Sequence, residues 1–453
     1  MVERVKYFVD LTFIKILKLS CGRMFSVEVA KMEEILNGLL DFLNKSHTEF
    51  NATYNIKEIL DNNNFIELEE GQNFKIERGK NYYLIRNDSS VIAFKVPLMI
   101  HNFAFKICAS HLDSPCLKLK MEKAISSKNY LKLNVEKYGG AIISTWLDKP
   151  LSVAGRVFYK KGGEIKREII DFNKPILIIP NVAIHFNRSI NDGYIYNIEQ
   201  DMKPIFALGN DENSFLEAIA NLLNINKDDI LSYDLECYNF ASSLVGGLNN
   251  EFLMSPRIDN LESAYLSLQG FIESNNENDI SVFVAFNNEE VGSQTFSGAD
   301  SDILKNTLKR ISNSLGFSEN DYFVSLAKSF LLSIDNGHAI HPNHQEFSDL
   351  NSPVYLNKGV IIKFNSNMAY TSDALTSSYI IDICKKNNIP YQLFYNRSDV
   401  RGGSTLGALS ISQLGIKSVD IGCPQLAMHS NYETSGTKDV QYMFELIKAY
   451  YLN

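Results

Sequence analysis

The pattern of apolar and polar residues in the C-terminal part of the chain alternates between two kinds of segment. Apolar residues at helical spacing form one kind, and short continuous apolar runs typical of buried strands form the other. Helices are predicted over Ile258–Ser274, Asp302–Leu315, Ala374–Lys386, Thr405–Gln413 and Val440–Tyr450, and strands over Ile280–Phe286, Ser329–Ile334, Gly359–Asn365, Tyr391–Tyr395 and Ser418–Gly422. Continuous apolar strands separated by helices predict an α/β fold, with a mostly parallel sheet covered by helices on both faces.

The region from 115 to 244 has a different pattern from the parts of the chain on either side of it. Before it, a helix is predicted over 25–44, and strands over Tyr82–Ile85, Val91–Lys95 and Phe103–Ala109. Within it, short β-like runs alternate with turns rich in Gly, Pro and Lys, and few long helices are predicted before residue 214. These runs are Tyr130–Val135, Ser152–Tyr159, Ile165–Ile170 and Pro175–Ile179. We therefore expect residues 1–114 and 245–453 to form one discontinuous domain, interrupted by a β-rich inserted domain over 115–244.

Composition narrows the class of protein. A chain of 453 residues is too long for one ordinary core, and 45% hydrophobic with 21% charged residues is typical of a globular protein. The formal net charge is −9 and no Lys/Arg-rich run occurs, which argues against nucleic acid as a partner. No stretch of about 18 consecutive apolar residues is present, so no membrane span is predicted.

The six cysteines are scattered without a CxxC pair, which argues against a disulfide framework and against a thiolate zinc site. A reducing, cytoplasmic location is the simplest expectation. Residues 7–19 are fairly apolar, but Asp10, Lys15 and Lys18 interrupt them, which a signal-peptide core does not tolerate. Met24 is an alternative start of the protein.

Polar residues follow the predicted strands at the edge where ligand sites form in such sheets, the carboxyl ends of the strands. Five separate segments bring His, Asp, Glu, Asp and His to this edge. These segments are His111-Leu-Asp113, Asn287-Asn-Glu-Glu-Val-Gly292, Asp335 followed by His338 and His341, Met428-His-Ser430 and, just ahead of a helix, Pro256-Arg-Ile-Asp-Asn260.

Two of these segments have a specific chemical logic. In an extended His-x-Asp the two side chains share one side, so Asp113 can hold one ring nitrogen of His111 and leave the other for a metal. Adjacent Glu289 and Glu290 would repel each other unless a cation compensated them. Each observation has a plainer alternative: a lone histidine is more often a surface or core residue, and paired glutamates are common in a first helical turn.

Two histidines and several carboxylates without a thiolate are the ligand set of a catalytic zinc site, for one or two ions. A glycosidase is a poorer match, because its two carboxylates must face each other across a sugar. The residue pattern leaves open whether Asp335, His338 or His341 is a ligand, and which of Glu289 and Glu290 is one.

The same segments resemble the aspartyl aminopeptidase family of dinuclear zinc peptidases, collinearly from about residue 105 to 430. The matching stretches are Ala109-Ser-His-Leu-Asp-Ser-Pro-Cys116, Val135-Glu-Lys-Tyr-Gly-Gly140, Ser144-Thr-Trp-Leu-Asp148, Leu151-Ser-Val-Ala-Gly-Arg156, Ile179-Pro-Asn-Val-Ala-Ile-His185, Pro256-Arg-Ile-Asp-Asn260, Asn288-Glu-Glu-Val-Gly-Ser293, Asp335-Asn-Gly-His-Ala-Ile-His-Pro-Asn343, Lys358-Gly-Val-Ile-Ile-Lys363 and Pro424-Gln-Leu-Ala-Met-His-Ser430.

The resemblance implies a role for each matching residue. Asp259 would bridge two divalent ions, most simply Zn²⁺, with Mn²⁺ or Co²⁺ as alternatives. His111 and Asp335 would complete the ligands of one ion, and Glu290 and His429 those of the other. Glu289 would be the general base for a hydroxide between the ions, and Asp113 would orient His111.

The resemblance also implies substrate and partners. The substrate would be a peptide with a free N-terminus, preferably Asp or Glu, with Lys363, Tyr370 and His338 expected at its side chain. The inserted domain would form dimers that assemble into a tetrahedral dodecamer, in which His185 would reach a neighbouring active site. Asn367 and Asp373 depart from the family pattern, and some members prefer leucine-like residues.

Two further alternatives remain: a metal-dependent carboxypeptidase or deacylase, and a non-catalytic oligomeric scaffold. The plainer alternative for His185 is a core histidine at a strand end, and that for Lys363 is an edge-strand lysine that points to solvent.

Overall fold

The computed structural model describes residues 30–400, 402–403 and 405–453. Residues 30–45 are helical, in agreement with the C-terminal part of the helix predicted over 25–44. The start of that helix, the apolar stretch 7–19 and Met24 lie outside the described residues.

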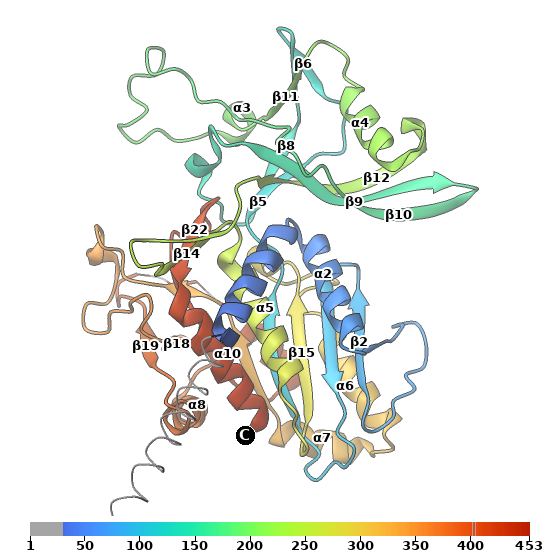
Figure 1. The fold of residues 1–453 in the computed structure, drawn as a ribbon, viewed down its shortest axis with the longest axis vertical. Helices are drawn as coiled ribbons and strands as arrows, with labels where there is room; N and C mark the ends of the chain where they lie inside the picture. The colour runs from blue at the N-terminus through green and yellow to red at the C-terminus, as the bar shows by residue number, and fades with distance from the viewer. Residues whose placement is uncertain (1–29, 401, 404) are drawn as a thin grey trace, which may run out of the picture.

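A nine-stranded sheet forms the centre of the lower body in Figure 1. From one edge to the other its strands are β1 (Ile66–Glu67), β2 (Asn81–Arg86), β3 (Ser90–Lys95), β15 (Ile280–Phe286), β4 (Phe105–His111), β16 (Phe330–Ile334), β20 (Lys417–Gly422), β18 (Val360–Phe364) and β19 (Tyr391–Tyr395). The four central strands β15, β4, β16 and β20 are mutually parallel.

The sheet is mixed, with five parallel and three antiparallel strand pairings in the described part of the chain, so the expectation of a mostly parallel sheet holds only in part. β3 runs antiparallel to both β2 and β15, and β18 runs antiparallel to β20. The turn at 87–89 joins β2 to β3, and a turn that short can connect only antiparallel neighbours. The sequence does not predict strand direction, because a strand buried on both faces has the same apolar pattern in either direction.

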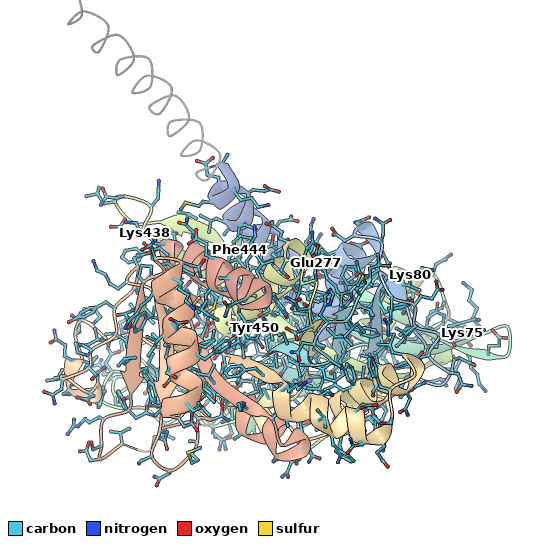
Figure 2. The ribbon with its side chains drawn as sticks, turned by 90° about the horizontal axis from the view of Figure 1, so that it is seen from below. Lys75, Lys80, Glu277, Lys438, Phe444 and Tyr450 are labelled. Carbon is cyan, nitrogen blue, oxygen red and sulfur yellow. The ribbon has the colours of Figure 1, made fainter. Side chains whose placement is uncertain are left out.

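Helices cover both faces, as predicted. Alternate residues of β15 show this: Phe283 and Ala285 pack with one hydrophobic cluster, and Val282 and Val284 with another. The first cluster includes α2 (Glu49–Asn62), α5 (Ile258–Glu273), α8 (Ala374–Lys386) and α10 (Thr437–Leu452), and the second includes α6 (Ile303–Ser314), α7 (Glu319–Lys328) and α9 (Leu406–Leu414). The helices α2 and α7 were not predicted. Figure 2 shows α10 with Phe444 and Tyr450, and the Tyr450 hydroxyl donates to the carbonyl of Phe330 in β16 at 2.7 Å.

The β-rich region forms the upper part of Figure 1 and has a hydrophobic core of its own. Its larger sheet is antiparallel, in the order β10 (Glu164–Asp171), β9 (Leu151–Lys161), β12 (Ile230–Asn239), β5 (Cys116–Leu119) and β8 (Val135–Tyr138). A smaller sheet contains β11 (Ile205–Leu208), β7 (Tyr130–Lys132) and β6 (Ile125–Ser127), and the helices are α3 (Ile198–Asp201) and α4 (Ser214–Leu223), with 3₁₀ turns η1 (Ile143–Trp146) and η2 (Lys227–Asp229).

Two of the strands expected in this region differ. The run Tyr130–Val135 is divided between β7 and β8, and Pro175–Ile179 forms only isolated bridges at Leu177 and Ile178. The domain boundaries and the dimerisation role of the region stay predictions.

A small sheet brings distant segments together beside the carboxyl ends of the central strands. Its order is β13 (Leu244–Gly246), β14 (Phe252–Ser255), β22 (Glu433–Gly436), β21 (Pro424–Leu426) and β17 (Gly337–His338), and the 3₁₀ turns η3 (Glu289–Val291) and η4 (Gln345–Phe347) complete the elements. Ser255 pairs with Glu433, so the chain leading to Asp259 runs beside the chain leaving His429. Among the described residues, no helix is both long and apolar enough to cross a bilayer.

Candidate metal centre

His111 is the last residue of the central strand β4, and its side chain is 1% exposed. Its Nε2 atom lies 3.6 Å from an oxygen of Asp259 and 3.6 Å from an oxygen of Asp335. Its Nδ1 atom lies 3.0 Å from the backbone carbonyl oxygen of Asp113 and 3.4 Å from the Asp113 carboxylate. The imidazole is therefore held by one nitrogen and faces two carboxylates with the other.

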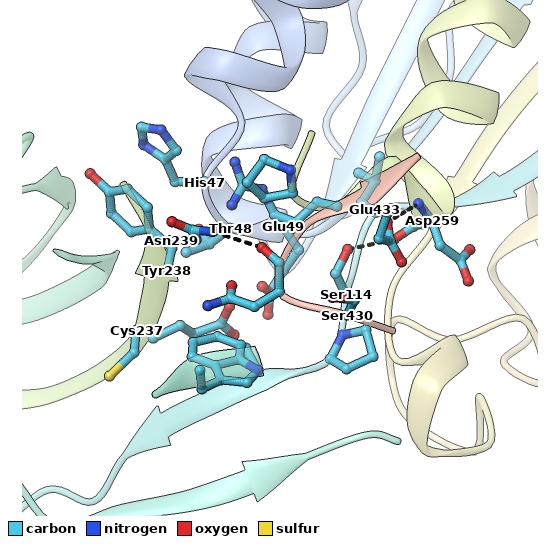
Figure 3. Close-up of a pocket in the computed structure, with 18 residues that line it drawn as sticks. His47, Thr48, Glu49, Ser114, Cys237, Tyr238, Asn239, Asp259, Ser430 and Glu433 are labelled. Atoms are coloured by element: carbon cyan, nitrogen blue, oxygen red, sulfur yellow. Dashed lines mark hydrogen bonds between the residues drawn. The ribbon is translucent and has the colours of Figure 1, made fainter. Parts of the chain in front are cut away.

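Asp259 lies between two histidines. Its Oδ1 atom faces His111, and its Oδ2 atom is 3.4 Å from Nε2 of His429. Its backbone is fixed on both sides: the N–H donates to Glu433 at 3.0 Å, and the carbonyl accepts the Ser114 hydroxyl at 2.7 Å (Figure 3). A buried and anchored carboxylate of this kind can serve two partners at once.

The two adjacent glutamates belong to the tight turn η3 that follows β15. Asn288 and Gly292 on either side of the turn both have positive φ. Oε1 of Glu290 lies 3.4 Å from Nε2 of His429. The backbone N–H groups of Glu289 and Glu290 each donate to the Asp113 carboxylate at 3.1 Å. Asp113 thus connects the strand end that carries His111 with the turn that carries both glutamates.

A glycine pair from the inserted region closes over this turn. A Cβ atom on Gly139 would lie 3.1 Å from Cβ of Glu290, and one on Gly140 would lie 3.0 Å from Nδ1 of His429. Gly139 also has a φ of 68°, a conformation that side-chain-bearing residues rarely adopt. The backbone of this pair therefore forms part of the wall of the site.

Two groups of side chains have the donor types and spacing to hold a metal ion. The Asp335 cluster contains His111, Asp259 and Asp335, and the Glu290 cluster contains Asp259, Glu290 and His429, with ligand atoms within 4.8 Å of one another. Asp259 belongs to both. Among the residues that the sequence left open, Asp335 and Glu290 lie in these clusters, whereas Glu289 does not and His338 and His341 are exposed.

The two clusters fit divalent cations. Oδ1 of Asp259 and Oε1 of Glu290 are buried and have no hydrogen-bond partner among the described residues. The nitrogen–oxygen separations of 3.4–3.6 Å exceed an ordinary hydrogen bond. Ligands at about 2.0–2.2 Å from a tetrahedral zinc lie roughly 3.3–3.6 Å apart, and imidazole with carboxylate is a common zinc donor set.

Burial and the neighbouring charges together set the proton equilibria of the site. It raises the pKa of Glu289 to about 8 and that of Glu290 well above the usual range. Burial lowers the pKa of His429, but Asp259 and Glu290 outweigh this and raise it to about 10. Burial would raise the pKa of Asp259, but the imidazoles of His111 and His429 that face its two oxygens outweigh this and hold the pKa far below the usual range. Protons held by such ligands leave when a cation binds, because metal ligands must be deprotonated.

Lys363 is 2% exposed and lies in β18 beside the Asp335 cluster. Its ammonium is 3.4 Å from Asp335 and 5.5 Å from the centre of the Tyr370 ring. His338 lies in β17, with its ring 6.4 Å from that of Phe394. His185 lies apart from these residues, in an exposed turn of the inserted region.

Sequence reasoning missed two residues that support the site. Glu433 accepts the N–H group of Asp259 at 3.0 Å (Figure 3) and that of His429 at 2.7 Å, and Tyr138 donates to Asp113 at 2.7 Å. Glu433 is the first residue of the short strand β22, which shows no strand-end pattern in the sequence, so only the pairing of β22 with β14 identifies it. Tyr138 directly precedes Gly139-Gly140, and this glycine pair was the one feature of the local sequence that pointed to Tyr138.

Comparison with known proteins agrees with this geometry. The family described as "Aminopeptidase I zinc metalloprotease (M18)" matches residues 42–451. The chain is 44% identical over 423 residues to a probable M18 family aminopeptidase 2 of Clostridium novyi (strain NT), covering 92% of this chain and 98% of the relative. It is 40% identical over 427 residues to a protein of the same name from Ectopseudomonas mendocina (strain ymp), covering 92% and 98%.

Solved structures give the same result for the fold. A chain of the Ape4 and Nbr1 complex superposes with a TM-score of 0.90 at 33% identity, covering 93% of this chain and 86% of that one. The S. cerevisiae mApe1 dodecamer superposes with a TM-score of 0.79 at 26% identity, covering 92% and 96%. The family resemblance predicted from the sequence is confirmed: the chain belongs to the M18 family of zinc metallo-aminopeptidases.

Proposed function

We propose that this protein removes the N-terminal residue, preferably Asp or Glu, from peptides with a free α-amine, and that it uses two divalent ions. The observation that carries the proposal is the position of Asp259, whose two carboxylate oxygens face His111 and His429 in two ligand clusters. Zn²⁺ is the most favourable occupant, and Mn²⁺ or Co²⁺ are alternatives.

The ligand sets follow from the two clusters. His111, Asp335 and a shared Asp259 would hold one ion, and Glu290, His429 and the same Asp259 would hold the other. When bound, such ions polarise a scissile carbonyl and make a water molecule more acidic.

Glu289 is the general base in this proposal. It is half-buried beside the clusters without belonging to either, and burial raises the pKa of Glu289 to about 8. A carboxylate with such a pKa is suited to accept a proton from water and to pass it to the departing amine near neutral pH. Asp113 keeps the Glu289 turn and the His111 ring in a fixed relative position.

The preference for acidic residues rests on Lys363. Its buried ammonium lies at the edge of the Asp335 cluster, where the first side chain of a bound peptide would pass. Tyr370 and the exposed His338 lie nearby and would line the pocket. The rival preference for leucine-like residues has support of its own, because Val354, Ile361, Tyr370 and Phe394 form a small apolar cluster beside Lys363.

Self-association is the second part of the proposal. Val182, Ile184 and Phe186 flank His185 and are 57%, 50% and 86% exposed. Apolar residues so exposed on one loop favour burial against another chain. We expect the inserted domain to form dimers in which His185 reaches the neighbouring active site and helps to bind the substrate carbonyl, and the dimers to form a dodecamer, as in mApe1. A cytoplasmic location fits Cys108, Cys116, Cys237, Cys384 and Cys423, which are all free thiols.

The test is hydrolysis of Asp-, Glu- and Leu-anilides, with N-acetyl-Asp-anilide as a matched blocked substrate, before and after treatment with a chelator. We expect fast cleavage of the Asp and Glu substrates, none of the blocked one, and loss of activity with the chelator. Removal of the acetyl group from the blocked substrate would favour a deacylase. Faster cleavage of the Leu-anilide than of the Asp- and Glu-anilides would support an aminopeptidase but contradict the acidic preference. A metal-saturated protein inert toward all four would favour the scaffold.

A further inference from the structure

We propose that Lys363 is a positioning residue for the ligand Asp335, and that it thereby controls how tightly the Asp335 cluster holds its ion. This inference rests on the two-ion site proposed above and adds a role to Lys363 that is independent of the substrate's side chain.

The two oxygens of Asp335 have different partners. Oδ1 faces Nε2 of His111 at 3.6 Å, whereas Oδ2 lies 3.4 Å from the ammonium of Lys363. The same ammonium donates to the backbone carbonyl of Asn336 at 2.7 Å. Lys363 therefore holds both the side chain of Asp335 and the backbone that follows it, and turns the free oxygen toward the cluster.

The path of the Lys363 side chain leaves it little freedom. It crosses Gly337, where an added Cβ would lie 3.3 Å from Cε of Lys363 and 2.2 Å from Cδ1 of Ile361. Asn336 is itself fixed, because its side-chain amide donates to Glu262 at 2.9 Å and to Gln425 at 2.8 Å. The lysine cannot swing away without leaving a buried charge unpaired, which is strongly unfavourable.

The charge of Lys363 is maintained by its surroundings. Its ammonium faces the Asp335 carboxylate at 3.4 Å and lies 5.5 Å from the centre of the Tyr370 ring, and both neighbours favour a positive charge. Residues that hydrogen-bond a metal ligand on the side away from the ion commonly change metal affinity or activity by about 10- to 100-fold when they are replaced. Lys363 occupies such a position relative to Asp335.

The geometry also bears on specificity. An ammonium has three N–H donors, and two are directed at Asp335 and Asn336. One remains for a substrate carboxylate. If Lys363 serves both purposes, its replacement lowers hydrolysis of every N-terminal residue through the metal site, and lowers hydrolysis of Asp and Glu further through the pocket.

The experiment is zinc titration of the full-length protein in competition with a chromophoric chelator, for wild type, Lys363→Met and Lys363→Arg. The matched control is Lys95→Met. Lys95 is half-buried and, like Lys363, donates to backbone carbonyls, here those of Ile272 and Ser274, but it lies in β3, on the other side of the four central strands from β18. Thermal unfolding of the metal-free proteins tests whether Lys363→Met is folded.

We expect wild type and Lys95→Met each to bind two zinc equivalents, and Lys95→Met to bind them as tightly as wild type does. Lys363→Met should bind one of them about 10- to 100-fold more weakly, and Lys363→Arg should recover part of the loss. Comparing the affinities of the two zinc equivalents within one variant distinguishes an effect on the Asp335 cluster from general misfolding. Misfolding would weaken the binding of both equivalents.

Two outcomes would overturn the inference. If Lys363→Met binds both equivalents as wild type does but loses its preference for Asp over Leu, Lys363 belongs only to the acidic pocket and the proposed function stands. If wild type itself fails to bind two equivalents, the two-ion site fails and the inference with it. Loss of one equivalent with an unchanged Asp-to-Leu ratio would support the inference and remove the acidic pocket.

Discussion

The carboxylate of Asp113 accepts the backbone N–H of Glu289 at 3.1 Å. The two residues come from neighbouring parallel strands, β4 and β15, and the contact ties the end of one to the turn after the other. The same carboxylate lies 3.4 Å from Nδ1 of His111. One buried side chain thus sets the distance between a proposed metal ligand and the proposed base.

Asp113→Asn should lower kcat by about 10- to 100-fold. The carboxylate accepts three donors, from Glu289, Glu290 and Tyr138, and an asparagine amide would direct its own N–H groups at one of them. Tyr138→Phe removes only one of these donors and should lower kcat much less. Steady-state kinetics of both variants with one substrate measures the difference, and equal effects would argue against this role of Asp113.

Glu289→Gln should keep its zinc and lose about 100- to 10,000-fold in kcat. The side chain lies beside both clusters without belonging to either, so its charge is needed for proton transfer rather than for binding the ions. The neighbouring Glu290→Gln is the matched variant and should lose zinc affinity. Metal analysis after dialysis separates the two, and a Glu289→Gln variant with wild-type turnover would remove Glu289 from the mechanism.

Gly139→Ala should reduce kcat/KM by at least about tenfold, because a shift of about 1 Å in a site can cost this much or more. The added Cβ would press on Glu290 at 3.1 Å, and the positive φ of 68° adds strain. Gly162→Ala is the control, since Gly162 has a φ of 62° but nothing within 4 Å of an added Cβ. Both variants should lose about 1 kcal/mol of stability. Only Gly139→Ala should lose activity, and unchanged activity would show that the glycine pair does not confine the turn.

Stability should fall between about pH 5 and pH 8 through Glu49. This buried carboxyl shares the ammonium of Lys118 with Glu236, at 3.3 and 2.7 Å. Burial, followed by the charge of Glu236, raises the pKa of Glu49 from 4.5 to about 8. The folded state therefore holds a proton that the unfolded state has lost, so the stabilisation is complete below pH 4.5 and disappears as the pH approaches 8.

Glu49→Gln replaces the protonated carboxyl by an amide that is neutral at every pH. The variant should therefore lose less stability than wild type as the pH rises from about 5 to about 8. At pH 8 the variant should exceed wild type by about 1 kcal/mol or more. The exposed Glu58 on the same helix provides the control, and Glu58→Gln should leave the pH profile unchanged. The measurement is thermal unfolding of the metal-free proteins at several pH values, and parallel profiles of wild type and Glu49→Gln would refute the assignment.

Zinc should raise the melting temperature of the metal-free protein, because an ion that binds only the folded state stabilises it by mass action. Asp259→Asn should abolish most of this rise, since Asp259 belongs to both clusters. Asp335→Asn should remove only part of it. Equal residual shifts for the two variants would argue that Asp259 is not shared.

The sequence by itself determined the α/β class, the position of the β-rich region and the segments that carry the site. These features are local: helical spacing marks α5 and α8, continuous apolar runs mark β15 and β16, and polar residues mark the strand ends at His111 and Asp335. A strand end can be located from its own residues, because the change from a continuous apolar run to polar residues occurs within one continuous segment.

Only the tertiary structure decided which side chains meet. The residue pattern left open whether Asp335, His338 or His341 is a ligand, and which of Glu289 and Glu290 is one. The family resemblance implied Asp335 and Glu290, and in the structure these two face His111 and His429. The mixed direction of the sheet, the support from Glu433 and the pairing of Lys363 with Asp335 were likewise not predictable. Neighbouring residues on a turn have the same local pattern, and contacts between strands far apart in the chain depend on strand order and turn geometry, which no local periodicity records.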